Sequence, residues 1–351
     1  MNRFALSVIA FGIVAHLTSA ALAADDVYKC PAAKAGGPIV LQVVMVEDED
    51  EKPAAAGKAA AEALKKAMGD VPLKAVIVSE CFEDKENKEK LLEGVCSVLP
   101  KDIIFGGATY GSFTQKSCTD FDSVCLLGIG GDGIGVSAAL VTDLGASKLS
   151  LDDQLAEIEK RLHAGGEKLA KKVPKSKKDQ LLILIPDAHS PKNTYLVEGV
   201  QKAVSPKFPV TGGSVNKNAG QTFVYFQGKM HTDAAVAVML SGKFKVALAG
   251  RKAKENDAVI KTAKDGAAEA IKGMKKAKPI AVLAYNCAGR RSKLKKMEDE
   301  LVAIQSAIGK EIPLFGCYNA GEIGPVDTAE KKPGTMCGGS GWHVMFTVIG
   351  K

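Results

Sequence analysis

Short, unbroken apolar runs alternate with longer amphipathic stretches along most of the chain. In one amphipathic stretch, apolar residues recur at Leu155, Ile158, Leu162 and Leu169, a spacing that places them on one face of a helix. The shorter runs show no alternation of apolar and polar residues, which is typical of strands covered on both faces. The pattern therefore predicts an α/β fold in which helices cover sheets.

The same order of elements occurs three times, and glycine-containing turns begin at Gly106, Gly212 and Gly316, about 105 residues apart. Each copy predicts strand, helix, strand, helix, strand and closing strand. The predicted strands are 39–45, 74–81, 102–107 and 123–127 in copy one, 135–141, 181–188, 208–214 and 234–240 in copy two, and 245–251, 279–287, 312–317 and 342–349 in copy three. The predicted helices are 54–68, 88–99, 152–172, 195–204, 257–274 and 297–308.

The three copies predict a pseudo-threefold body of mixed sheets. Parallel strands joined by helices require right-handed crossovers, and we expect each closing strand to pair antiparallel with the strand before it. The turns after the three third strands should then face one common region.

Composition agrees with this fold class. The 351 residues include 46% hydrophobic, 25% charged and only 5% aromatic residues, together with 36 glycines, which excludes intrinsic disorder and favours a core of small and aliphatic side chains. The net charge of +7 comes from lysines scattered over the predicted helices. Nucleic-acid binding would need clustered basic residues with interleaved aromatic side chains, so we expect no nucleic-acid partner.

The first residues are typical of a secretory signal peptide. Arg3 precedes the apolar run Phe4–Leu17, and Ala21-Leu22-Ala23 is a small-x-small cleavage site. This run is too short to span a bilayer, and we expect a protein that is not integral to the membrane. The sequence thus predicts a signal peptide at 1–23 with cleavage near Ala23-Ala24, an N-terminal extension at 24–36, and a periplasmic or secreted location.

Gly128–Gly133 matches G-x-G-x-x-G after a strand, but another β-rich run follows it rather than a helix. Asp132-Gly133 is instead predicted as a hairpin turn. The sequence contains no C-x-x-C, H-E-x-x-H, C-x-x-C-H or Walker motif, so it predicts neither a cofactor nor a metal site. Asp187 and His189 follow a predicted strand, either as acid–base equipment or as a hydrogen-bonded loop pair.

All eight cysteines follow the signal peptide, and an even number in an exported chain favours two to four disulfides. Cys118 could pair with Cys125, and Cys317 with Cys337. Alternatively, a cysteine at a strand end (Cys81, Cys287 or Cys317) remains a redox-sensitive thiol or a metal ligand.

The segment Ile312–Pro325 resembles the signature of FIST domains, sensory modules named from F-box and intracellular signal transduction proteins. The matching residues are Gly316, Tyr318, Gly321, Glu322, Ile323, Gly324 and Pro325, and Cys317 replaces the usual aromatic residue. The Ala54–Met68 helix, the Val76–Cys81 run and the turn ending at Ser214 are similar to the N-terminal part of the family. The resemblance extends from about Gly37 to Lys351, and it divides the chain into a FIST N-terminal domain at 37–241 and a FIST C-terminal domain at 242–351.

This resemblance implies a sensory protein that binds a small ligand, with amino acids as the suggested class. FIST modules usually pass a signal to an attached output domain, for which the predicted organisation leaves no room. The expected partner is therefore a membrane-bound receptor or kinase.

The equivalent turns are the predicted binding site, because ligands of α/β sheets bind beyond the carboxyl ends of strands. Glycine lets backbone N–H groups approach an anion such as a carboxylate, and Glu322 could pair with a ligand ammonium. The predicted ligand-binding residues are Gly106, Gly107, Thr109, Gly212, Gly213, Ser214, Gly316, Cys317, Tyr318, Asn319, Gly321 and Glu322. Alternatively, the glycines only allow close packing and Glu322 caps a backbone group.

Two other function classes stay open, although the sequence favours a binding protein over an enzyme and predicts no catalytic residue. One is a hydrolase of a small cyclic amide or ester. Cyclic-amide hydrolases with three repeats carry a Lys–Ser pair in each copy, whereas the turns here offer Thr109, Ser214 and Asn319 without matching lysines. The other is a redox or metal-handling protein that uses the strand-end cysteines.

Overall fold

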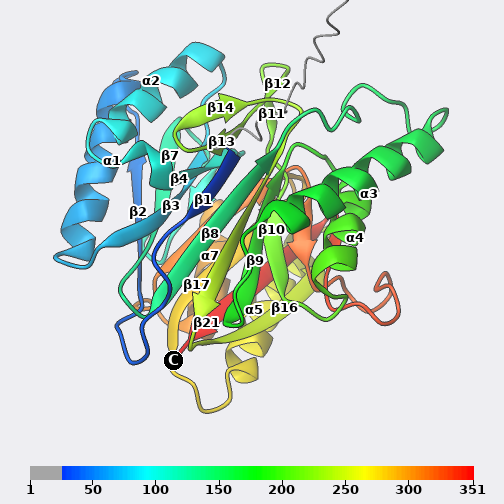
Figure 1. The fold of residues 1–351 in the computed structure, drawn as a ribbon. Helices are drawn as coiled ribbons and strands as arrows, with labels where there is room; N and C mark the ends of the chain where they lie inside the picture. Colours follow the sequence, from blue (N-terminus) through cyan, green and yellow to red (C-terminus); the bar gives the residue numbers. More distant parts are fainter. Residues whose placement is uncertain (1–25) are drawn as a thin grey trace, which may run out of the picture.

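The computed structural model describes residues 26–351 and confirms a mixed α/β fold, with helices packed around several mixed sheets (Figure 1). The predicted signal peptide, residues 1–23, lies outside the described residues. Within the described part, no helix is long and apolar enough to cross a membrane.

The first sheet is built mainly from residues 40–130 and carries one pair of helices. Its strand order is β14-β13-β4-β3-β7-β2. Its own elements are β2 (Val40–Glu47), α1 (Pro53–Met68), β3 (Leu73–Glu80), α2 (Lys85–Cys96), a short 3-10 turn (Lys101–Ile103), β4 (Ile104–Ala108) and β7 (Ser123–Gly130).

The second sheet has seven strands in the order β1-β8-β15-β9-β10-β19-β20. Its main elements are β8 (Ile134–Val141), α3 (Leu155–Lys172), β9 (Asp179–Pro186), α4 (Asn193–Val204), β10 (Val210–Gly213) and β15 (Ala235–Gly242). Residues of the predicted N-terminal extension form β1 (Val27–Lys29), which pairs antiparallel with β8.

The third sheet has the order β16-β21-β17-β18-β5-β6. Its main elements are β16 (Lys245–Lys252), α5 (Asn256–Gly273), β17 (Pro279–Cys287), α6 (Ala288–Arg291), α7 (Met297–Ile308), β18 (Leu314–Asn319) and β21 (His343–Gly350). The inner faces of the three sheets share one hydrophobic core, to which β3, β9 and β17 contribute the buried side chains Ile77, Ile183 and Leu283.

The closing strands do not pair with the strands before them, contrary to our expectation. In each sheet the closing strand (β7, β15 or β21) instead lies between the first and second strands and is antiparallel to both. The second and third strands are parallel neighbours, as β3 and β4 illustrate. A long connecting segment, here called an excursion, follows each third strand and lets the chain return past the second strand. The closing strand then forms backbone hydrogen bonds with the first and the second strand at once.

The predicted hairpin turn at Asp132-Gly133 is also corrected. A turn is present, but it joins β7 to β8, which belong to different sheets and do not pair. Gly133 N–H donates instead to the Pro38 carbonyl at 2.8 Å. The segment therefore links two sheets, and a strand follows it, as the β-rich run predicted.

Each excursion between a third strand and a closing strand contributes a hairpin to a neighbouring sheet. The chain pairs β5 (Ser112–Phe113) with β18, β13 (Val224–Phe226) with β4, and β19 (Glu322–Gly324) with β10. The outer strands of these hairpins are β6 (Cys118–Thr119), β14 (Lys229–His231) and β20 (Gly338–Ser340), while β11 (Lys217–Asn218) and β12 (Gln221–Thr222) form a small separate hairpin.

Candidate functional site

The three predicted turns meet near the centre of the molecule. Gly107, Thr109, Gly213, Cys317 and Asn319 all line one cavity of about 10 Å³, which is room for about one water molecule. The Asn319 side chain donates to the Ser214 carbonyl, and the Ser214 N–H donates to the Gly321 carbonyl at 2.8 Å. The structure therefore brings the turns together as predicted, in a buried and closely packed arrangement.

Close packing accounts for the glycines of these turns. A Cβ added at Gly212 would overlap the Leu184 carbonyl, and one at Gly106 would overlap the Val78 carbonyl. Gly316 is packed in the same way, against the Phe113 ring. The backbone of an adjacent strand, or the Phe113 ring in the case of Gly316, thus occupies the space that a side chain would need. A ligand at the turns stays a prediction, and it would require this central cavity to widen.

Ser214 has no base within reach among the described residues. Its hydroxyl donates to the Ala188 carbonyl at 2.8 Å, which holds the loop that follows β9. The Ser190 N–H donates to the Ala320 carbonyl at 2.9 Å and fixes the same loop from the other side. Ser214 and Ala320, which belong to two of the predicted turns, therefore hold the loop 187–190 in place, and the residues of this loop line an open cavity.

This open cavity, here called the β9 cavity, has a volume of about 290 Å³ and lies at the carboxyl end of β9. Its charged or polar lining residues are Ser147, Lys148, Asp187, His189, Ser190, Lys192, Lys217 and Thr222. Asp187 Oδ2 accepts hydrogen bonds from Thr222 Oγ1 at 2.7 Å and from Asp233 N–H at 2.9 Å. Asp187 Oδ1 has no partner within residues 26–351, although the side chain is only 6% exposed.

The cations of the β9 cavity divide into one that is satisfied and two that are available. Lys192 Nζ donates to the carbonyls of Ala146 and Leu149, both at 2.8 Å, and burial lowers its pKa. Lys148 and Lys217 are exposed and form no ion pair in the described part of the chain. Two ammonium groups are thus free to attract an anion to this cavity.

His189 completes the β9 cavity as a neutral group. Burial lowers the pKa of its imidazole, so the ring is uncharged at neutral pH, and its Nε2 atom has no partner among the described residues. Asp187 and His189 therefore lie in a cavity, although no direct hydrogen bond joins the two side chains there. Sequence reasoning singled out both residues from their place after a strand, and it missed Lys148, Lys217 and Thr222, which come from separate loops.

Glu322, a predicted ligand-binding residue, lies elsewhere and is completely buried. One carboxylate oxygen accepts the His343 N–H at 3.0 Å, while Oε1 has no hydrogen-bond partner in the described region. The Cys287 thiol at the end of β17 lies against this carboxyl group. Burial raises the pKa of Glu322 to about 8 and that of Cys287 to about 12, so both groups are mainly neutral at pH 7.

Trp342 lies beside the Cys287 thiol, and its indole ring packs over Gly289. Its backbone N–H donates to Cys287 Sγ at 3.2 Å, and its φ of +63° lies in the left-handed region, where a bulky residue is strained. Lys254 Nζ lies 5.2 Å and Lys293 Nζ 6.0 Å from the centre of the Trp342 ring, which is a cation–π geometry. This position of Trp342 could not be predicted from the sequence, because it depends on tertiary contacts.

Two buried ion pairs support the ends of second strands. Lys88 pairs with Glu80 at the end of β3, and both side chains are fully buried. Arg290 pairs with Glu300 at 2.9 Å and also donates to Asn286 near the end of β17. Tyr318, another predicted ligand-binding residue, donates its hydroxyl to Glu300 at 3.0 Å and so belongs to this buried network.

All eight cysteines are free thiols, and neither suggested disulfide is formed. Cys125 and Cys317 belong to the central core, whereas Cys118 packs against the core of the third sheet and Cys337 against that of the second. The members of each suggested pair therefore lie in different hydrophobic clusters. In the described region, no group of three or more His, Cys, Asp or Glu residues is arranged to hold a metal ion.

Some solved structures are similar to this chain at low sequence identity. No curated protein matches it. Two solved structures of cyanuric acid hydrolase, one of them from A. caulinodans, are each 9% identical and have TM-scores of 0.46 and 0.43, covering 89% of this chain and 99% of theirs. PurLQS from Thermotoga maritima has a TM-score of 0.31 and 9% identity, and the match covers 90% of this chain and 73% of that one.

Family models identify the chain directly. The FIST N domain matches residues 74–266, more than half of the chain, and the FIST C domain matches residues 234–325. These ranges contain the three glycine turns, the β9 cavity residues and Glu322. The resemblance seen in the Gly-Glu-Ile-Gly-Pro segment is confirmed, and the chain belongs to the FIST family.

Proposed function

We propose that this protein is a sensory module that binds a small zwitterion, with an amino acid as the suggested ligand, in the β9 cavity. Membership of the FIST family, whose domains are sensory and bind small ligands, supports the general class. The observation that carries the proposal is the convergence of one carboxylate and two available ammonium groups, from Asp187, Lys148 and Lys217, around about 290 Å³.

Charge complementarity assigns each part of the ligand a place. The ligand ammonium would lie beside Asp187 Oδ1, which has no partner within the described residues, and the carboxylate beside Lys148 and Lys217. His189, neutral because burial lowers its pKa, can offer Nε2 to either part. The predicted residue Ser214 would act indirectly here, by holding the Ala188 carbonyl and thus the cavity wall.

Thermal shift measurements test this proposal with a panel of amino acids and analogues that lack one charge. At a hundred times the dissociation constant, a true ligand adds about 2.7 kcal/mol to the free energy of unfolding. Alanine and propionate, for example, differ by the ammonium group that Asp187 would bind. We expect at least one amino acid to raise the melting temperature more than its deaminated analogue.

Variants locate the ligand. Lys148→Glu with Lys217→Glu should abolish the shift, and Asp187→Asn should remove the advantage of the amino acid over its deaminated analogue. Lys65→Glu with Lys66→Glu, an equal charge change at two exposed positions of α1, is the matched control and should leave the shift unchanged. A panel without any shift, or lysine variants that respond like the parent, would contradict the proposal.

We further propose that the protein is exported, and that a membrane-bound receptor or kinase reads the bound state. The signal-like sequence before Ala24 motivates the first part. We also propose a pseudo-threefold arrangement, which the common strand order of the three sheets supports and in which the central turns connect all three units. Labelling of the protein in intact cells by a reagent that stays outside the cytoplasmic membrane would test its location.

A further inference from the structure

A second cavity, larger than the β9 cavity, lies at the opposite ends of the strands. It has a volume of about 430 Å³, and its lining comes from Gly37 before β2, from the Gly133 and Lys243 turns before β8 and β16, and from Lys351 after β21. These positions precede first strands or follow a closing strand, whereas the β9 cavity follows the carboxyl end of a second strand. The β9 cavity is lined by residues of β11 and β12 and the second cavity by the C-terminal residue, and these parts of the chain lie at opposite ends of the molecule (Figure 1).

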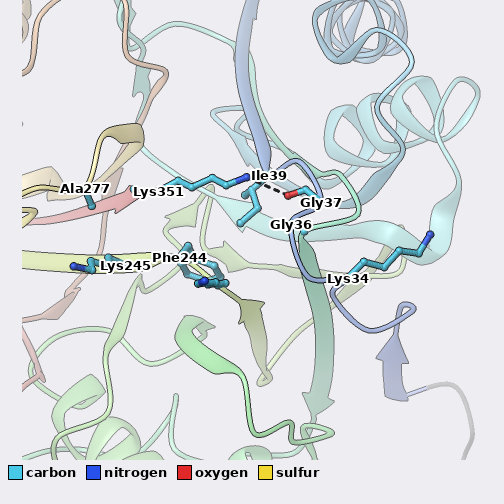
Figure 2. Close-up of a pocket in the computed structure, with 11 residues that line it drawn as sticks. Lys34, Gly36, Gly37, Ile39, Phe244, Lys245, Ala277 and Lys351 are labelled. Atoms are coloured by element: carbon cyan, nitrogen blue, oxygen red, sulfur yellow. Dashed lines mark hydrogen bonds between the residues drawn. The ribbon is translucent and has the colours of Figure 1, made fainter.

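This second cavity, here called the lysine-rimmed cavity, has an apolar floor. Ile39 and Phe244 are 9% and 6% exposed, and Ala277 faces the same space. Figure 2 shows Phe244, from the turn before β16, and Lys351, which follows β21, with a hydrogen bond of 3.2 Å from Lys351 Nζ to the Gly37 carbonyl. An apolar floor of this kind gains free energy by covering a hydrocarbon or aromatic group.

The rim of the lysine-rimmed cavity is strongly basic. Lys34, Lys243, Lys245 and Lys351 line it, and Asp132 neutralises only Lys34, at 2.9 Å. Lys243 and Lys245 form no ion pair with any residue of the described part of the chain. These two lysines flank Phe244 in the sequence and line the same cavity, so it combines unpaired positive charge with an apolar floor.

We propose that the lysine-rimmed cavity binds a small amphipathic anion, with its apolar body against Phe244 and Ile39 and its acidic group between Lys243 and Lys245. A purely inorganic anion would leave the floor uncovered, and an uncharged hydrocarbon would leave the lysines without a counter-ion. The β9 cavity, whose lining is mainly charged or polar, has no comparable apolar floor for such a ligand. The volume of about 430 Å³ is within the range of sites for small organic ligands.

Calorimetric titration with decanoate tests this inference, with acetate as the acidic group alone and decyltrimethylammonium as the same chain with reversed charge. We expect decanoate to bind at least about tenfold more tightly than either control compound. Equal binding of acetate would show that the floor contributes nothing, and equal binding of decyltrimethylammonium would show that the lysines contribute nothing. Either result would overturn the proposal, as would a lack of decanoate binding.

Two variants of the lining and two control variants assign the site. Lys243→Glu with Lys245→Glu should weaken decanoate binding at least about tenfold, and Ala277→Trp should do so by filling the cavity. Lys276→Glu with Lys278→Glu changes the same charge close by without altering the lining, and should retain binding. Lys217→Glu in the β9 cavity should also retain it, so the result is independent of the amino-acid proposal. Unchanged binding in the Lys243 and Lys245 variant would refute the assignment.

Discussion

The buried carboxyl group of Glu322 lies against the thiol of Cys287, and both groups keep their protons at neutral pH. Burial is the main cause in each case, because it disfavours the charged forms. The backbone N–H groups of Trp342 and His343 complete the contacts of the pair. A residue predicted to bind a ligand ammonium is thus buried, and its described contacts are with the protein itself.

Glu322 should make the stability of the protein depend on pH. Its pKa of about 8 in the folded protein is above the ordinary value of 4.5, so the folded state binds more protons than the unfolded state between these two values. The Glu322 contribution is therefore complete below about pH 4.5 and is lost as pH rises through 8, by at most about 1.4 kcal/mol per pH unit.

Urea unfolding of the parent and Glu322→Gln at pH 5, 6, 7 and 8 measures this contribution. The difference between the two free energies of unfolding should change with pH in favour of the variant as pH rises. Comparing the two proteins removes the effect of His343, whose pKa is lowered by burial and which both contain. A difference that is constant over this pH range would show that Glu322 ionises normally.

Trp342 should control the reactivity of Cys287. Cys287 is only 8% exposed, and the indole ring stands over the neighbouring Gly289. Replacing Trp342 with Ala should accelerate alkylation of Cys287 by iodoacetamide at least about tenfold, because access limits the reaction of a buried thiol. Peptide mass spectrometry measures the labelling of each cysteine over time.

The other cysteines provide the control for this experiment. Cys81, which is partly exposed at the end of β3, should be labelled at the same rate in the parent and the Trp342→Ala variant. If the substitution accelerates the labelling of all cysteines equally, the variant is unfolded and Trp342→Phe is the better probe. Fast labelling of Cys287 in the parent protein would contradict the covering role of Trp342.

Removing one member of a buried ion pair should be costly. Arg290→Met leaves the fully buried Glu300 carboxylate without its cation, and we expect a loss of about 3–5 kcal/mol in the free energy of unfolding. Lys261→Met breaks an exposed pair with Asp265 and should cost about 1 kcal/mol or less. Denaturant unfolding of both variants gives the comparison, and equal losses would show that the Arg290 network adds little.

The close approach of strands at the turns should make Gly212 irreplaceable. Gly212 has a φ of +149°, and an added Cβ would overlap the Leu184 carbonyl, so Gly212→Ala should cost about 3 kcal/mol or more. Gly220 also has a positive φ, of +81°, but open space surrounds it. Gly220→Ala should therefore cost only about 1–2 kcal/mol, and a similar cost for Gly212→Ala would mean that the strands can separate.

Local pattern was sufficient for the long elements of this fold. The predicted strand 279–287 and helix 297–308 coincide with β17 and α7, because the first is a nearly unbroken apolar run and the second has the apolar spacing of a helix. The exchanged hairpins were not predictable in this way. Strands such as β5, of two residues, have no period, and only pairing with a distant strand defines them.

The same distinction applies to the candidate site. Asp187 and His189 can be predicted as candidate site residues because they follow a strand, a position that sequence alone can identify. Lys148 and Lys217 lie 69 residues apart in the chain and meet only because separate loops surround the end of β9. The disulfide prediction was wrong for a related reason, since proximity in sequence did not reflect the burial of Cys125 and Cys317 in the central core.

The exchanged hairpins make the three sheets mutually dependent. The first third of the chain completes the third sheet, the second third completes the first, and the last third completes the second. A fragment ending after β7 would keep β4 but lose β13, exposing an unpaired strand edge that invites aggregation. Truncation or domain shuffling should therefore fail at any boundary between the units. Insertions during evolution should be tolerated mainly in loops that contribute no strand to a neighbouring sheet.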